Sequence, residues 1–361
     1  MHLRILDYVD VKTEGLQSDI TKYLRDEYGY FEATEKSRHA PDIVIEFVEE
    51  MSSLEQSVHV RDPISYDNEG VFIHDPDYHV VRIDFEAIGQ STCHVTCDVN
   101  FNQYFLSIIM EYLVHFYMVK KEAVFCHSSA FKVDGSVILC PAWRNVGKTN
   151  LLLAFLKDGA EYISDDWSVL HSDATIRSLA KRIQLLHYNF DAYPELLDYA
   201  SDDFVALARF IMLVKKDGYD LDQRTLSALE QKARLRLSPY KTFKQEFDTS
   251  SMSLDHVFLL KREMNNDAPV TATKIDTNTL VSKMSAILEF EQSYFHLAYL
   301  AHKAQIGKPN PFLDTARERS FRVMHEAMDA MPSRYQVTLQ SRHSSEEVHT
   351  VISQLIAQAA D

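Results

Sequence analysis

The sequence predicts an α/β protein in which a small α+β domain precedes a larger α/β domain with helical additions. Three observations predict this class. The first hundred residues hold alternating segments around one helical segment. An apolar segment at residues 136–140 leads through a loop into an apolar helix at residues 150–156, and a third apolar segment ends in two aspartates, at 165 and 166. With 361 residues, the chain is long enough for two domains.

The first hundred residues indicate strands around one helix. Four segments alternate with the period of two that is typical of strands: residues 3–11, 42–47, 71–74 and 79–85. One segment has apolar residues at helical spacing: Leu16, Ile20, Tyr23 and Leu24. This pattern predicts an α+β accessory domain over residues 1–100, whose chemistry the pattern does not indicate.

Two cysteines lie close together in this domain and raise the question of a metal site. In the alternating segment 91–99, Cys93 and Cys97 fall on one strand face with Val95, whereas His94 falls on the other. The histidine therefore points away from the thiols. We expect buried cysteines here rather than a zinc site.

A connecting helix is predicted over residues 101–122. It is aromatic-rich and apolar on nearly every face, so we expect it to pack between the two domains. Its most apolar part, residues 104–119, is short and interrupted by Glu111 and His115, which excludes a membrane-spanning helix. We expect no membrane partner.

A phosphate-binding loop is predicted at residues 140–149, which have the sequence CPAWRNVGKT. Gly147 is one of 9 glycines in the chain, which marks a position where the backbone needs glycine. In such a loop the backbone N–H groups and the positive end of the next helix hold phosphates, Lys148 reaches the terminal ones, and the Thr149 hydroxyl binds Mg²⁺. The predicted nucleotide contacts are Ala142, Arg144, Asn145, Val146, Gly147, Lys148, Thr149 and Asn150.

The loop departs from the usual pattern at Ala142, where a glycine normally lets the turn tighten. An alanine fits there if its φ is negative. Trp143 and Arg144 are bulky, so we expect them to point away from the phosphates or to close over the nucleotide.

An acidic pair, Asp165 and Asp166, follows where a metal and an attacking hydroxyl would need carboxylates. A neighbouring carboxylate and a phosphate both raise the pKa of such a group, while Mg²⁺ lowers it. Acids at a solvated strand end are common, and it is the preceding loop that favours a role in an active site.

The second domain is predicted over residues 123–361. Its later elements are charged helices over 191–240 with a break at Asp217-Gly218 and a stop at Pro239, a strand at 254–260, helices over 277–331 broken at 307–311, a strand at 335–342 and a closing helix at 345–357. Ser344 or Ser345 caps that last helix, and Glu346 suits its first turn.

Composition excludes several classes of protein. A net charge of −16 argues against a nucleic-acid partner. Four cysteines are too few for a disulfide scaffold, and the first residues lack the apolar core of a signal peptide. We expect a protein of the reducing cytoplasm, and a homo-oligomer stays open.

The order of motifs over residues 124–190 resembles the catalytic domain of the HPr kinase/phosphorylase family, which shares its nucleotide fold with ATP-dependent phosphoenolpyruvate carboxykinase. The shared pattern is a histidine at the start of a strand, a glycine turn, the phosphate loop, a helix ending near glycine, and a strand closing in two aspartates. The matching residues are His127, Gly135, Gly147, Lys148, Thr149, Gly159, Asp165 and Asp166.

The resemblance implies an ATP- and Mg²⁺-dependent kinase. It makes Lys148 the phosphate contact, and Thr149 and Asp166 the metal ligands. It makes Asp165 the general base for the attacking hydroxyl, and His127 a polar group beside the two aspartates.

The chain also departs from that family. The glycine-rich signature of the bifunctional bacterial enzymes, with its metal-binding glutamate, is absent, and residues 177–190 have the sequence RSLAKRIQLLHYNF instead. HPr is therefore not supported as the acceptor, and the chain is more similar to divergent relatives that phosphorylate free serine or a serine in a precursor peptide. Arg182 in this stretch is a candidate phosphate clamp, although an arginine on a strand edge is more often solvated.

We therefore expect transfer of the γ-phosphate of ATP to a serine-like hydroxyl of a small molecule or peptide. An alternative is a nucleotide-binding regulatory or assembly module that uses ATP as a conformational ligand. Such a module needs Lys148 and Thr149 but no base, so Asp165 discriminates between the two. A carboxykinase-like lyase is disfavoured because no second metal site is identified.

Overall fold

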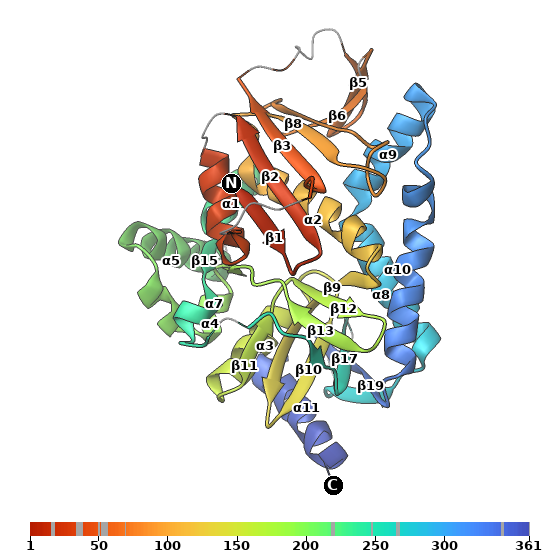
Figure 1. Cartoon of the computed structure of the whole chain (residues 1–361). Helices are drawn as coiled ribbons and strands as arrows, with labels where there is room; N and C mark the ends of the chain where they lie inside the picture. Colours follow the sequence, from red (N-terminus) through yellow and green to blue (C-terminus); the bar gives the residue numbers. More distant parts are fainter. Residues whose placement is uncertain are drawn as a thin grey trace.

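The computed structural model describes residues 1–15, 19–33, 39–49, 51, 57–68, 70–217, 221–246, 248–264, 268–340 and 343–360. Leu16, residues 218–220 and residues 341–342, which belong to predicted elements, lie outside the described residues. The protein is α/β with mixed sheets: within these ranges the strands form an eight-stranded sheet, a nine-stranded sheet and a two-stranded pair (Figure 1).

The first sheet has the strand order β1-β2-β3-β8-β7-β6-β5-β4. Its parallel neighbours are β2, β3 and β8, while the other pairs are antiparallel. The strands are β1 (His2–Ile5), β2 (Val9–Gly15), β3 (Ile43–Val48), β4 (Val58–Arg61), β5 (Ile64–Asp67), β6 (Gly70–His74), β7 (Val80–Ile83) and β8 (Cys93–Asp98).

This sheet corrects two expectations. The strand predicted over residues 3–11 is two strands, β1 and β2, which pair around a turn where Leu6 and Asp7 have φ values of 54° and 61°. Positive φ is uncommon for residues other than glycine, and the alternation of apolar and polar residues does not reveal it. Strands β4 and β5 are also unpredicted, and all four residues of β4 are exposed, so β4 has no buried face to recognise.

One helix stands between the sheets, and a second helix packs against it. Helix α1 (Asp19–Tyr28) packs against α2 (Gln103–Val119), which also contacts β9 of the second sheet. From Leu106 onward nearly every residue of α2 is buried, because helices and strands surround it. Asn102 caps its start by accepting hydrogen bonds from the backbone N–H groups of Tyr104 and Phe105.

The second sheet has the order β16-β13-β12-β9-β10-β17-β19-β18, with β11 also paired to β9. Strands β10, β17 and β19 are parallel, and the other pairs are antiparallel. The strands are β9 (Ala123–Val133), β10 (Ser136–Pro141), β11 (Glu161–Ser164), β12 (Trp167–His171), β13 (Thr175–Ser178), β16 (Met252–Ser253), β17 (His256–Glu263), β18 (Thr271–Lys274) and β19 (Ser333–Gln340).

Helices cover both faces of this sheet. Helix α3 (Lys148–Lys157) packs against β9 and against α11 (Ser345–Ala360), while α8 (Thr277–Glu291) and α10 (Pro311–Asp329) pack against β9 with α2. Helix α9 (Ser293–Ile306) packs instead against β5 and β6 of the first sheet. The helices therefore join the two sheets as well as cover them (Figure 1).

Asn310 makes the tightest link between α10 and the first sheet. Its side-chain oxygen caps α10 by accepting from the N–H groups of Phe312 and Leu313. Its amide nitrogen donates to the carbonyl oxygens of Phe85 and Ile88, both at 2.8 Å. The residue is buried, so one side chain satisfies both a helix end and a loop beside β7.

The segment after β13 is a helical insertion that contains a small sheet. Its elements are β14 (Ile183–Leu185), α4 (Asn189–Ala192), η3 (Pro194–Tyr199), α5 (Asp202–Asp217), α6 (Gln223–Lys232), β15 (Leu235–Leu237) and α7 (Pro239–Thr242). Residues 235–237 were expected in a helix but pair with β14. Pro239 begins α7 instead of ending a helix, because proline fits the first helical position, where its missing N–H is not needed.

The cysteines lie in the core. Cys93 and Cys97 point inward from β8 and His94 between them is exposed, as the alternation predicts. Cys126 and Cys140 are buried in β9 and β10, and all four thiols are free. Within the described ranges, no helix is long and apolar enough to cross a membrane.

Burial makes these thiols inert, and this can be tested. Burial raises the pKa of Cys126 to about 12 and raises the pKa of Cys93, Cys97 and Cys140 as well, so little thiolate forms. We expect no reaction of the folded protein with the thiol reagent DTNB at about pH 8, near the pKa of a free thiol. Four thiols should react after unfolding in guanidinium. A thiol that reacts rapidly in the folded state would contradict the burial.

Candidate functional site

The predicted phosphate loop connects β10 to α3. Ala142 continues the strand through a parallel bridge to Leu260 and is not among the residues with positive φ, so it does not need the freedom of a glycine. The left-handed positions are Asn145, with a φ of 60°, and Gly147, with a φ of 116°. The turn therefore depends on Gly147 and on an asparagine, a residue that tolerates this conformation better than most.

The start of α3 has donors that no side chain caps. Gly147 is its N-cap residue and offers no side-chain acceptor, and the first bond within the helix runs from the Leu151 N–H to the Gly147 carbonyl. The N–H groups of the first turn thus point out of the helix at its positive end. This end can hold an anion such as a phosphate.

Lys148 and His127 both face Asp166. The Lys148 ammonium lies 3.0 Å from the Asp166 carboxylate, and His127 Nε2 lies 3.5 Å from it. His127 Nδ1 lies 2.7 Å from the carbonyl oxygen of Ala142. Because that oxygen only accepts, Nδ1 carries the hydrogen, and the ring is fixed between the loop and the acidic pair.

Asp165 instead faces Thr149. The Thr149 hydroxyl donates to Asp165 Oδ2 at 2.9 Å, and the Tyr162 hydroxyl accepts from the Asp165 N–H at 3.0 Å. Within the described residues, the buried Oδ1 of Asp165 has no hydrogen-bond partner. A cation or a proton can satisfy a buried carboxylate oxygen that has no donor.

The pKa values of the two aspartates are shifted in opposite directions. Burial raises the pKa of Asp165 above its ordinary value, although Lys148 opposes the change. The side chain of Asp166 is half-exposed, and the neighbouring Lys148 and His127 hold the pKa of Asp166 well below its ordinary range. Asp166 has a φ of 72°, a strained conformation that occurs at functional sites. Paired carboxylates whose pKa values are driven apart are typical of acid–base sites.

These residues border a cavity of about 370 Å³, within the size range of small-molecule sites. Its floor is the loop between β10 and α3 with the acidic pair, and its walls come from α1, α2, β14, β15 and the end of α8. The lining residues are Glu27, Tyr104, Ser107, Ile108, Glu111, Tyr112, His127, Arg144, Asn145, Gly147, Lys148, Thr149, Asn150, Asp165, Asp166, Trp167, Lys181, Arg182, Gln184, Leu186, Tyr188, Asn189, Arg234, Arg236 and Glu291.

Glu111 of α2 is the central acid of the wall and is only 4% exposed. Its carboxylate accepts from the Tyr28 hydroxyl at 2.6 Å and from the Trp167 indole N–H at 2.8 Å. The Lys181 ammonium lies 2.5 Å from it. One carboxylate therefore joins α1, α2, β12 and the segment before β14.

Basic side chains gather in this cavity although the chain is acidic. Arg236 pairs with Glu27 at 2.8 Å, and Arg182 lies 3.5 Å from Asp26. Arg234 lies over the Tyr104 ring, and no carboxylate among the described residues forms an ion pair with it. Its buried Nε has no hydrogen-bond partner in the same part of the chain. Arg234 is thus a cation with donors free for a ligand.

The structure brings most of the predicted site residues together. Those that border the cavity are His127, Arg144, Asn145, Gly147, Lys148, Thr149, Asn150, Asp165, Asp166 and Arg182. Ala142 and Val146 do not border it, because their side chains are buried in the core. Only the backbones of these two residues can contribute to the predicted loop. The Val146 carbonyl accepts a hydrogen bond from Arg262.

The bulky loop residues are held by the end of α8. Arg144 donates from Nε to both oxygens of the buried Glu291, at 2.7 and 2.8 Å. Trp143 packs on Phe290, with ring centroids 4.6 Å apart. Arg144 is therefore bound to protein rather than free for a phosphate, and Trp143 points away from the cavity.

Several residues of the site are absent from the sequence prediction, among them Glu111, Lys181, Arg234 and Glu291. The sequence did indicate a role for Glu111, because a carboxylate inside an otherwise apolar helix needs a hydrogen-bond or ion-pair partner when it is buried. Glu291 is 147 residues from Arg144, and no local pattern connects them. Comparison with known protein families finds no model that matches this chain, and comparison with curated proteins finds no matching sequence.

The contacts of Glu111 predict a large stability effect. Glu111→Gln should lower the free energy of unfolding by about 3–5 kcal/mol, because it leaves the buried Lys181 without its counter-charge. The measurement is urea unfolding followed by circular dichroism. Glu263→Gln is the control, because Glu263 is in an exposed pair with Lys261, and it should cost less than about 1 kcal/mol. Equal losses in the two variants would contradict the role assigned to Glu111.

Proposed function

We propose that this chain is an ATP- and Mg²⁺-dependent kinase with an HPr kinase-like nucleotide domain, and that it transfers the γ-phosphate to a hydroxyl of a small molecule or peptide. The observation that carries the proposal is the convergence of Lys148, Thr149, Asp165 and Asp166 on one cavity. A site that only binds a nucleotide needs the loop but not a pair of carboxylates beside it.

The loop supports binding of a triphosphate. The uncapped start of α3 offers backbone N–H groups, and Lys148 stands beside them. Burial alone would lower the pKa of Lys148, but Asp166 and Asp165 raise it, so the ammonium stays charged. The lysine would leave Asp166 for the terminal phosphates when ATP binds.

The residues also fit Mg²⁺. The Thr149 hydroxyl and the carboxylate of Asp165, whose Oδ1 has no partner among the described residues, are oxygen ligands of the kind this ion prefers. Bound there, Mg²⁺ would neutralise phosphate charge during transfer. This pairing differs from the expectation that Thr149 and Asp166 hold the metal, since the Thr149 hydroxyl faces Asp165.

We therefore assign proton acceptance to Asp166, which lies beside His127 and faces the cavity. In the absence of nucleotide, Lys148 holds the pKa of Asp166 low. Once Lys148 pairs with phosphate, Asp166 loses that cation and gains a negative neighbour, and its proton affinity rises. The acceptor hydroxyl then gives its proton to Asp166 as its oxygen bonds to the γ-phosphorus and ADP departs.

The far wall supports an acceptor that carries an anionic group beside its hydroxyl. Arg234 has donors with no ion-pair partner in the described part of the chain, and Arg182 borders the same wall. Serine and short peptides are the first acceptors to test. We also propose a cytoplasmic location, which the four free cysteines and the use of ATP support.

The first test concerns the loop. Lys148→Ala should weaken ATP binding roughly 10- to 100-fold, which corresponds to loss of one hydrogen bond to a charged group, about 1.5–3 kcal/mol. Calorimetry with ATP and Mg²⁺ measures the affinity. Lys157→Ala, at the other end of α3, is the matched control and should bind ATP like the wild type. Unchanged ATP affinity in Lys148→Ala would remove the loop assignment.

The second test separates the two aspartates and distinguishes an enzyme from a binding module. Asp166→Asn should bind ATP at least as well as the wild type but transfer phosphate roughly 10²- to 10⁴-fold more slowly, because the base is lost. Asp165→Asn should instead require more Mg²⁺ for activity. The measurement is transfer of labelled γ-phosphate to the best acceptor from a screen of serine, other hydroxyl metabolites and peptides.

The pattern of results decides between assignments. A slow Asp165→Asn with an altered Mg²⁺ requirement in Asp166→Asn would return the two roles to those implied by the family resemblance. Tight ATP binding by the wild type with no acceptor in the screen would favour a regulatory nucleotide-binding module.

A further inference from the structure

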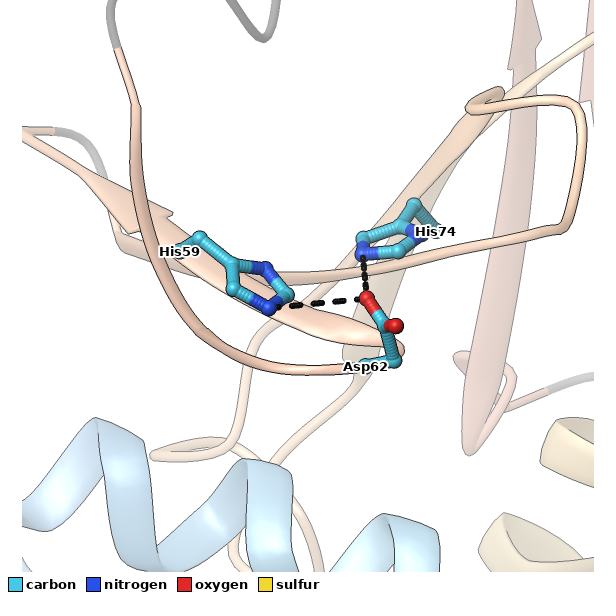
Figure 2. Close-up of side chains that lie close together, drawn as sticks. All are labelled: His59, Asp62 and His74. Atoms are coloured by element: carbon cyan, nitrogen blue, oxygen red, sulfur yellow. Dashed lines mark ion pairs between the residues drawn. The ribbon is translucent and has the colours of Figure 1, made fainter.

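Three side chains at the edge of the first sheet, far in sequence from the phosphate loop, form a compact group: His59 of β4, Asp62 in the turn that follows, and His74 of β6 (Figure 2). We propose that they bind a divalent transition-metal ion of the zinc class, as a site separate from the cavity and independent of the proposed kinase function.

The spacing of the three side chains suits one small ion. Asp62 Oδ1 lies 3.5 Å from His59 Nε2 and 3.8 Å from His74 Nε2, and all three ligand atoms lie within 4.8 Å of one another. Zinc binds nitrogen and oxygen at about 2.0–2.2 Å, so two ligands of one tetrahedral ion lie about 3.3 Å apart. Shifts of a few tenths of an ångström to about 1.5 Å, in the exposed side chains of His59 and Asp62, bring the three atoms to one centre.

The orientation of His74 supports metal binding. Its Nδ1 lies 3.3 Å from the Asp75 carbonyl oxygen, which only accepts, so Nδ1 carries the hydrogen. Nε2 of the neutral ring then presents a lone pair toward Asp62. A ligating histidine usually has its other ring nitrogen bonded to a carbonyl or carboxylate in this way. Tyr78 stacks on the ring, with centroids 5.4 Å apart, and helps to hold it.

The same geometry needs a positive charge to be stable. Both histidines direct Nε2 at one carboxylate oxygen, and a lone pair facing a carboxylate is repulsive unless a proton or a cation lies between them. Two imidazoles with one carboxylate prefer Zn²⁺, Co²⁺ or Ni²⁺ over Mg²⁺ and Ca²⁺. The group therefore selects a different class of ion from the one proposed at Thr149.

The place of the group in the fold indicates what the ion would do. His74 is nearly buried, whereas the side chains of His59 and Asp62 are 57% and 83% exposed, so water can complete the coordination. Strand β4 is the edge of the sheet, and all four of its residues are exposed. An ion shared by β4, the turn and β6 fastens this edge strand to the sheet across β5.

The test uses the full chain freed of metal, with Zn²⁺ and Co²⁺ as probes. We expect one Zn²⁺ per chain in competition with a chromophoric chelator, visible absorption when Co²⁺ binds, and no competition from Mg²⁺. His59→Gln alters an exposed residue, so it should fold normally and lose at least the about 10- to 100-fold in affinity that loss of a supporting contact costs. Asp62→Asn should behave likewise. Zinc should also slow amide exchange in β4.

His94→Gln is the matched control, because His94 is an exposed histidine on β8 of the same sheet. It should bind zinc like the wild type. Equal zinc affinity in the wild type and His59→Gln would overturn the proposal, and so would the absence of one-to-one binding by the wild type at micromolar zinc. In either case the three side chains do not form a metal site.

Discussion

The buried carboxylate of Glu111 is the interaction on which the arrangement of this protein depends. A charge in the interior is tolerated only when every partner is in place, because removing one leaves the others desolvated and unpaired. Glu111 takes its partners from α1, from β12 and from the segment before β14. Helix α1, helix α2, strand β12 and the segment before β14 must therefore meet in one way for this group to be stable.

The meeting of these elements around Glu111 also determines which residues line the cavity. The walls are built by elements of both halves of the chain, while the floor is the loop between β10 and α3 and the turn before β12. The register of β9 with β12 sets His127 opposite Trp167, directly beside Asp166. Acidic and basic side chains both line the space, so a chain with a net charge of −16 can present ammonium and guanidinium groups to an anion.

Sequence patterns predicted those features that depend on residues close together in the chain. Gly147, Lys148 and Thr149 lie on one turn, and the alternation around Cys93 placed both thiols inside. Long-range partners escaped prediction: Arg144 is engaged by Glu291, and the Thr149 hydroxyl turned toward Asp165. The turn at Leu6 was missed because a positive φ depends on tertiary context, and β4 because an exposed edge strand has no apolar side.

The contacts of Asn310 affect folding during synthesis as well as the stability of the folded protein. Its amide bonds Phe85, 225 residues earlier, and the aromatic ring of Phe295 packs on that of Phe85 at 5.3 Å. At synthesis rates of about 5–20 residues per second, the first sheet emerges roughly 10 to 45 s before the segment that covers it. During that interval apolar surface stays open, and contacts of such sequence separation also slow folding. Exposed apolar surface of this kind is prone to aggregation, so this topology couples the fate of the first sheet to completion of α9 and α10.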